Sequence, residues 1–234
     1  MNKSFVIAVF LSLFLSVAAE SNQYQVLGLT LKKLNGKQIM LLHFKGEEVY
    51  KVDTTIIKNG KFLFQGRADS VHFAMIACGN YPERVLSARL MLETGNITVQ
   101  LGVPSEVGGT LLNEVYQNYL KVYTTYEDSL NLLSRPAQYD SIQQIDVNKR
   151  YLKNWEVSSQ IEQDFIKKNL NNPLGITLLK EAFMHINIDV FKAMVGAGDS
   201  ILLRDPDIKY LIAWIADQDE KERLRQESQN AANQ

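Results

Sequence analysis

Cysteine is almost absent from this sequence, since Cys78 is the only one among 234 residues. A single cysteine cannot form an internal disulfide, an iron–sulfur site or a CxxC redox pair. Proline is also scarce, with 5 residues, which excludes collagen-like and proline-rich disordered classes. Positive charge is not in excess either: 25 Lys and Arg stand against 26 Asp and Glu, so we expect no nucleic-acid partner.

Only one long apolar run is present, and it lies at the N-terminus. Phe5–Leu15 follows Lys3 and precedes the small residues Ser16–Ala19, which is typical of a secretory signal peptide cleaved near Ala19. The alternative, a transmembrane anchor, needs about 20 apolar residues. No cysteine lies near the cleavage point, so a lipid anchor is not expected. The sequence therefore predicts a signal peptide over residues 1–19 and a soluble, periplasmic or secreted product without a stable membrane anchor.

Residues 20–108 have the pattern of short strands. Val49–Ile57 is rich in β-branched residues, and Lys61–Gln65 alternates between polar and apolar side chains. Asn59-Gly60 lies between them and predicts a β-hairpin, because both residues tolerate the positive φ that a type I′ turn requires. Short strands at about ten-residue spacing, without intervening helices, predict an antiparallel β-sandwich-like domain.

From residue 109 the hydrophobic period becomes helical. Thr110 is a suitable N-cap for a first helix, and Asp205-Pro206-Asp207 is a strong start for the last one. We expect a helical domain over residues 109–216, followed by a polar tail over residues 217–234 that forms a solvated helix end. The fold class is therefore α+β, with a β-sandwich-like domain first and a helical domain second.

Residues that could carry chemistry are few. His43, His72 and His185 are far apart in the sequence and each has apolar neighbours, so we expect satisfied or partly buried side chains instead of metal ligands. Cys78 lies in an apolar strand without an adjacent base, which favours a buried, inert thiol over a reactive one. No GxSxG motif is present. The sequence therefore predicts no metal, no cofactor and no enzyme activity.

Two aromatic features are candidates for recognition. Tyr116, Tyr119, Tyr123 and Tyr126 fall on one side of the first predicted helix. They either pack that helix against the rest of the fold or form a surface for a partner or small ligand of unknown identity. Trp214 near the C-terminus could cover a core or contact another chain.

Four segments occur in an order that is characteristic of one family: Tyr24–Leu31, Val49–Ala68, Met91–Leu101 and Gly108–Tyr119. This part of the chain resembles the domain of unknown function that precedes the thioredoxin-like domain in exported thiol–disulfide oxidoreductases of Bacteroidetes. The helical region resembles the connector that follows that domain. Residues shared with the pattern look structural, with Asn59-Gly60, Gly66 and Gly95 serving turns.

The resemblance does not bring the oxidoreductase activity with it, because the thioredoxin-like domain of those relatives supplies the CxxC. We therefore expect an exported, non-catalytic accessory or binding module of the bacterial cell envelope. The alternative is a component of a thiol–disulfide exchange system, acting with a separate thioredoxin-like partner or through Cys78. A hydrolase with an unmarked carboxylate site is a third, weaker hypothesis.

Overall fold

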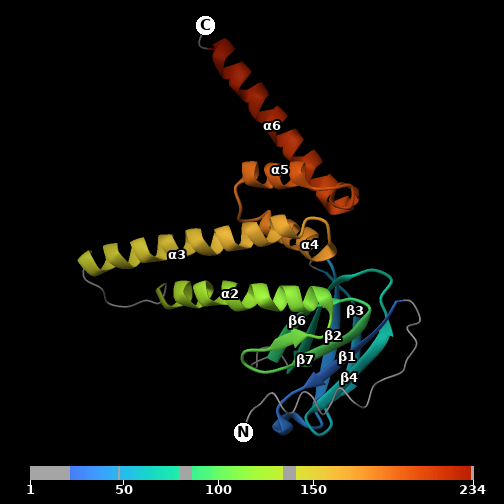
Figure 1. The fold of residues 1–234 in the computed structure, drawn as a ribbon. Coiled ribbons are helices and arrows are strands. Elements are labelled where there is room, and N and C mark those ends of the chain that lie inside the picture. Colours follow the sequence, from blue (N-terminus) through green and yellow to red (C-terminus); the bar gives the residue numbers. More distant parts are fainter. Residues whose placement is uncertain (1–21, 47, 80–85, 134–140, 233–234) are drawn as a thin grey trace. The chain divides into compact units, whose positions relative to one another are not determined.

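The computed structural model describes residues 22–46, 48–79, 86–133 and 141–232, so the expected leader segment lies outside the described residues. The chain divides into two compact units, one ending at Asn113 and the other beginning at Glu114. Strands make up the first unit and helices the second, as Figure 1 shows. The predicted α+β class is confirmed.

The described part of the first unit contains two four-stranded sheets, with the orders β4-β1-β7-β8 and β3-β2-β5-β6. The strands are β1 (Gln23–Leu29), β2 (Gln38–Lys45), β3 (Glu48–Ile56), β4 (Lys61–Arg67), β5 (His72–Cys78), β6 (Leu86–Leu92), β7 (Gly95–Gln100) and β8 (Glu106–Gly108). Adjacent strands are antiparallel except β1 and β7, which run parallel. The first sheet is therefore mixed, whereas the sequence predicted only antiparallel pairs.

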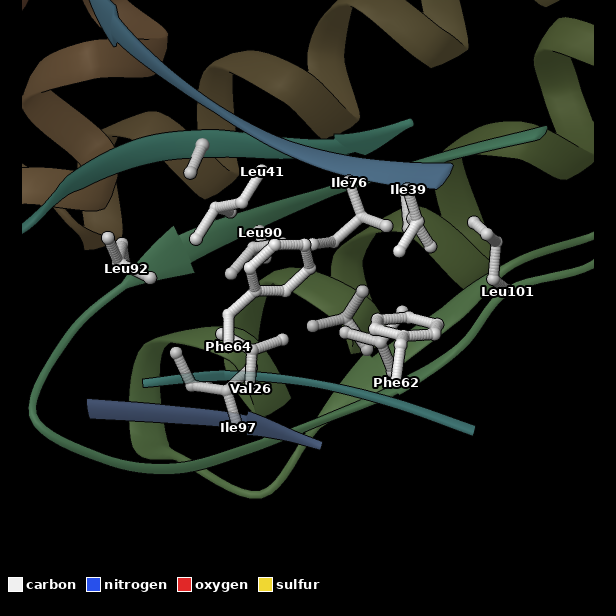
Figure 2. Packing of buried hydrophobic residues seen from close by; sticks show 14 of the residues in the cluster. Val26, Ile39, Leu41, Phe62, Phe64, Ile76, Leu90, Leu92, Ile97 and Leu101 are labelled. Carbon is white, nitrogen blue, oxygen red and sulfur yellow. The ribbon is translucent and has the colours of Figure 1, made fainter. Parts of the chain in front are cut away.

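The two sheets bury their inner faces against each other. Alternate residues of each strand enter one apolar cluster, as the pleat of a strand requires. On β2, for example, Ile39 and Leu41 are fully buried while Met40 between them is half-exposed. Figure 2 shows Phe62 and Phe64 of β4 and Ile97 of β7 packed among the aliphatic side chains of the opposite sheet. This core holds the strands in one register, because a one-residue slip would expose it.

The predicted turn at Asn59-Gly60 is confirmed, with φ of 53° and 71°. Lys58 and Lys61 close it with two backbone hydrogen bonds of 2.9 and 3.0 Å. The hairpin expected there is wrong, because the flanking strands β3 and β4 belong to different sheets and share only this bridge. The turn therefore carries the chain from one layer of the sandwich to the other.

The first helix, α2 (Leu111–Leu133), begins at a polar lock made by Glu93, Thr110 and Asn113. Glu93 accepts hydrogen bonds from the amides of Leu112 (2.9 Å) and Asn113 (3.3 Å), while Thr110 Oγ1 accepts from the Asn113 side chain. Thr110 lies directly before Leu111, at the expected N-cap position, while the amides of Leu112 and Asn113 donate to the Glu93 carboxylate. A carboxylate at a helix N-terminus stabilises the helix more strongly, because it also meets the positive end of the helix dipole.

Asn113 completes this lock from a fully buried position. Its side-chain amide accepts from Met91 N and donates to Met91 O, both at 2.8 Å. Since β6 is the edge of its sheet, Asn113 takes the place of a neighbouring strand for one residue.

The second unit contains α3 (Ser141–Lys168), α4 (Pro173–Ala182), α5 (Ile188–Ala197) and α6 (Pro206–Ala232). Asp205 caps α6 by accepting from the amides of Asp207 (3.0 Å) and Ile208 (3.1 Å), which confirms the helix start predicted there. Apolar side chains from these helices, and Leu170 from the turn between α3 and α4, form the buried part of the unit; the helical ones include Ile166, Leu174, Leu179, Phe191, Met194, Ile208 and Ile215. No described helix has an apolar stretch long enough to span a membrane.

Helix α6 continues without a break to Ala232, which includes most of the segment predicted as a polar tail and confirms that this segment is a helix end. Its exposed turns carry ion pairs at helical spacing, such as Lys221 with Asp217 and Arg223 with Glu227. Such pairs add a few tenths of a kcal/mol each to an exposed helix. Trp214 lies nearer the start of α6, with its ring edge-on to Phe183 and the centroids 5.8 Å apart. Its ring thus contacts Phe183 on one side, while 42% of its surface stays exposed.

We predict that Asn113→Ala destabilises the first unit by about 2–4 kcal/mol, because it leaves the backbone groups of Met91 without their buried partner. Urea unfolding measures the change, with exposure of the buried Cys78 thiol to a thiol reagent as the reporter for this unit. Asn118→Ala, at an exposed position of α2, is the matched control. Equal midpoints for the two variants would contradict the lock.

Candidate functional site

The polar side chains inside the sandwich gather around His43 and His72. Antiparallel pairing of β2 with β5 sets His43 opposite Ala74, so that His72, two residues away, is its diagonal neighbour on the same face. Nδ1 of His43 and Nε2 of His72 are 3.2 Å apart. The two histidines, which are 29 residues apart in the sequence, are therefore neighbours in the fold.

Strand β3 brings three more polar side chains to this place. Its register shifts beside His43, so that Lys51 stands opposite His43 and Tyr50 is the extra residue. Such a bulge re-aims side chains and is common next to functional sites. Tyr50 consequently lies with its ring centroid 6.0 Å from that of His43 and 6.1 Å from that of His72. We call His43, His72, Tyr50, Lys51 and Asp53 the histidine cluster.

Asp53 is the anion of the histidine cluster. Its Oδ2 lies 2.9 Å from His43 Nε2 and 2.8 Å from Lys51 Nζ. Partial burial alone would raise the pKa of this carboxyl, but the hydrogen bonds from Lys51 and His43, together with their charges, hold it below its usual value. Asp53 is therefore a carboxylate at neutral pH, and it accepts from both partners.

His43 is the buried member of the pair, with 2% of its surface exposed. Burial lowers its pKa, and the hydrogen bond to Asp53 offsets this effect only in part. His72 is half-buried, and its Nδ1 lies 2.8 Å from the carbonyl oxygen of Ser70. Polar contacts thus run from Asp53 through both imidazoles to the backbone of Ser70.

Tyr24 of β1 closes the cluster from the opposite sheet. Burial raises the pKa of its hydroxyl; the Asp53 carboxylate adds to this rise, and Lys51 opposes it. Its ring lies over Gly66, where a Cβ would come within 2.6 Å of the Tyr24 oxygen. Gly66, which was expected to serve a turn, instead lies within β4 opposite Tyr24, where its lack of a Cβ allows the close approach of this ring. An open depression of about 400 Å³ adjoins Tyr24 and Gly66, lined by Gln23, Gln25, Gln65 and Arg67.

Among the strands that the structure describes, the bulged strand β3 lies at the edge of its sheet and pairs with β2 alone. It nevertheless exposes large apolar side chains, namely Val49 (45%), Tyr50 (57%), Val52 (48%) and Ile56 (44%). Natural edge strands are usually short, charged or covered, since an apolar edge attracts further strands. The histidine cluster and this apolar edge therefore adjoin each other on β3.

The tyrosine row predicted as a candidate surface lies mainly inside the fold. Tyr116 and Tyr119 are buried, and Tyr123 and Tyr126 are half-buried. Within the helical unit, the Tyr119 ring stacks on Phe165 with centroids 4.2 Å apart. Burial raises the pKa of the Tyr119 and Tyr123 hydroxyls, and the nearby Glu162 carboxylate raises both further.

Cys78 lies at the end of β5 with 4% of its surface exposed. Its thiol donates to the carbonyl oxygen of Gln38 at 3.7 Å. Burial raises the pKa of the thiol, and the charge of Lys37 lowers it only in part. A thiol in this state forms little thiolate, which is the reactive form.

Sequence reasoning missed the histidine cluster because it considered spacing along the chain. His185 does stand apart, with its Nε2 2.8 Å from Glu162 Oε2. For the other two, the available signal was a histidine on the inner face of each of two apolar strands. Among the described residues, no group of three or more His, Cys, Asp and Glu side chains is arranged to hold a metal ion.

Residues 25–116 match the model of a family described as Domain of unknown function (DUF4369). The match covers the strands that carry the histidine cluster and the polar lock at the start of α2. No curated protein matches the chain significantly.

We predict that Cys78 in the folded protein reacts with a thiol reagent at least about 100-fold more slowly than in urea, because the thiol is buried and mostly protonated. Val122→Cys in a Cys78→Ala background places a thiol at a half-exposed position and gives the reference rate. Labelling of Cys78 at that reference rate would revive a redox function for this residue.

Proposed function

We propose that the chain is an exported, non-catalytic binding or accessory module of the bacterial cell envelope. It would be a relative of the domain that precedes the thioredoxin-like domain in exported oxidoreductases of Bacteroidetes. The signal-peptide pattern of residues 1–19 supports export, and the family match over residues 25–116 supports the relationship. The burial of Cys78 favours binding over thiol exchange by this chain itself.

The observation that carries the proposal is the apolar edge strand β3. Its backbone hydrogen-bonding groups on the side away from β2 face no other strand of the described sheets. An extended segment of another protein can add to such an edge, with the backbone providing affinity and alternate side chains providing specificity. We therefore assign β3 as the recognition edge.

The occupant of this edge is an extended segment of a second exported protein, for example a separate thioredoxin-like protein. Register is regular from Lys51 to Ile56, so this stretch can pair with a partner strand without interruption. Val52 and Thr54 alternate with the inward Asp53 and lie on the outer face, where they favour β-branched apolar side chains of the partner.

We predict that Val52→Lys weakens partner binding at least about tenfold, which corresponds to about 1.4 kcal/mol, because it places a charge at the centre of the edge. The partner is first captured by a photo-crosslinking residue at position 52 of the full exported protein in the cells that make it. Its affinity for the parent protein and for the variant is then measured with both proteins purified.

Val122→Lys is the matched control, since Val122 is exposed to almost the same extent (50%) but lies on α2. It should bind as the parent protein does, and a photo-crosslinker at position 122 should not capture the same partner. Equal affinities for Val52→Lys and the parent protein would refute β3 as the recognition edge.

A further inference from the structure

The two imidazoles of His43 and His72 face each other along a nearly straight line. Their ring centroids are 5.5 Å apart and the facing nitrogens 3.2 Å apart. The difference between these distances is about twice the radius of an imidazole ring, so both nitrogens lie close to the line between the ring centres. This is the geometry of a nitrogen–nitrogen hydrogen bond, in which one N–H points at one lone pair.

Each ring also has its other nitrogen beside an acceptor. His43 Nε2 is 2.9 Å from the Asp53 carboxylate, and His72 Nδ1 is 2.8 Å from the Ser70 carbonyl oxygen. Neither acceptor carries a proton at neutral pH, so both outer nitrogens must be N–H donors for these bonds to form. The Tyr50 hydroxyl, 3.5 Å from His72 Nε2, is too distant to replace the bond between the rings.

The proton count follows from these contacts. Three hydrogen bonds connect Asp53, His43, His72 and Ser70, and each needs one proton on a ring nitrogen. Two neutral imidazoles carry two such protons in total, so forming all three hydrogen bonds at once requires a third proton. We propose that His43 and His72 form a proton-binding site that takes up one proton, which makes His72 an imidazolium donating to both His43 and Ser70.

Burial decides which ring carries the charge. His43 is almost fully enclosed, whereas His72 is half-buried at the start of β5. An imidazolium loses more hydration at His43, in agreement with the lowered pKa of that ring. Uptake of a second extra proton would make both rings positive, with their facing nitrogens only 3.2 Å apart. The pair therefore takes up a single extra proton, and His43 stays neutral.

The charged and titratable groups around the pair come from two strands. Strand β3 contributes Tyr50, Lys51 and Asp53, and β1 contributes Tyr24. The Lys51–Asp53 ion pair has no net charge, so it has little effect on proton uptake by the two histidines. On the other side, β6 presents the apolar Leu92 opposite His72. The pair is therefore the part of this cluster whose charge changes in the histidine range of pH.

Loss of the proton breaks the hydrogen bond at the exposed end of this series, between His72 and Ser70. The neutral pair can keep two of the three hydrogen bonds. The bonds to Asp53 and between the rings are the more enclosed, whereas the Ser70 carbonyl is exposed and can bond to water instead. Deprotonation at His72 Nδ1 passes the proton to water and releases Ser70. The pair thus acts as a latch on the β4–β5 connection that closes as the pH falls.

The test is an imidazole ¹⁵N titration of the full chain by nuclear magnetic resonance, from about pH 8 to pH 4 in the presence of a chelator. We expect His72 Nδ1 to gain a proton in one step, while His43 Nε2 stays protonated and His43 Nδ1 stays unprotonated throughout. The amide signals of Ser70 and Val71 should move with the same midpoint. His185, which pairs with Glu162, serves as an internal reference.

His72→Gln separates the latch from a merely structural role. The glutamine amide can donate to His43 Nδ1 without titrating, so the fold and the His43 signals should persist while the pH response of Ser70 and Val71 disappears. Full protonation of both rings in independent steps would overturn the proposal. So would a Ser70 response that persists in His72→Gln. Stoichiometric Zn²⁺ binding at the two facing nitrogens of the chelator-treated protein would also overturn it, since it would identify a metal site.

Discussion

Burial of the two inner sheet faces against each other is the constraint on which the first unit depends. Because side chains alternate along a strand, every second residue of the central strands must be apolar or fully hydrogen-bonded. Ile39 and Leu41 satisfy this rule by packing in the core, and His43, the next inward residue of β2, satisfies it with hydrogen bonds. The inner face therefore changes from apolar to polar within one strand.

The position of the histidine cluster follows from that change. A buried imidazole needs partners for both nitrogens, and the sheet provides them from its two neighbouring strands. Strand β3 supplies Asp53 and, through the bulge, Tyr50 and Lys51, while β5 supplies His72. The same bulged strand forms the apolar edge of the sheet. A single strand thus connects the charge state of the cluster with the surface to which we assign recognition.

Much of the fold could be predicted from the sequence. The turn at Asn59-Gly60 has a local cause, the tolerance of both residues for positive φ. The cap at Asp205 also has one, since the amides in the first turn of α6 lack partners within the helix, and both features were predicted correctly. The parallel pairing of β1 with β7 was missed because it depends on how distant strands meet. Glu93 as the cap of α2 was missed for the same reason, since it lies 19 residues before Leu112, whose amide donates a hydrogen bond to it.

The candidate site was less accessible to sequence reasoning. The helical spacing of Tyr116 and Tyr119 left open whether they pack inside the fold or form a recognition surface, and both are buried. His43 and His72 have no motif spacing, yet the pairing of β2 with β5 makes them neighbours. Helical periodicity shows which residues share a face but not whether that face is covered. Contacts between strands require the register, which one sequence does not contain.

The account depends most on β3 being the open edge of a stable sandwich. Native-state hydrogen exchange of the whole chain measures this directly. Every second amide of β3, on the side away from β2, should exchange orders of magnitude faster than the amides of the central strands β2 and β5. Uniformly slow exchange along β3 would mean that the edge is already covered, and it would contradict the account.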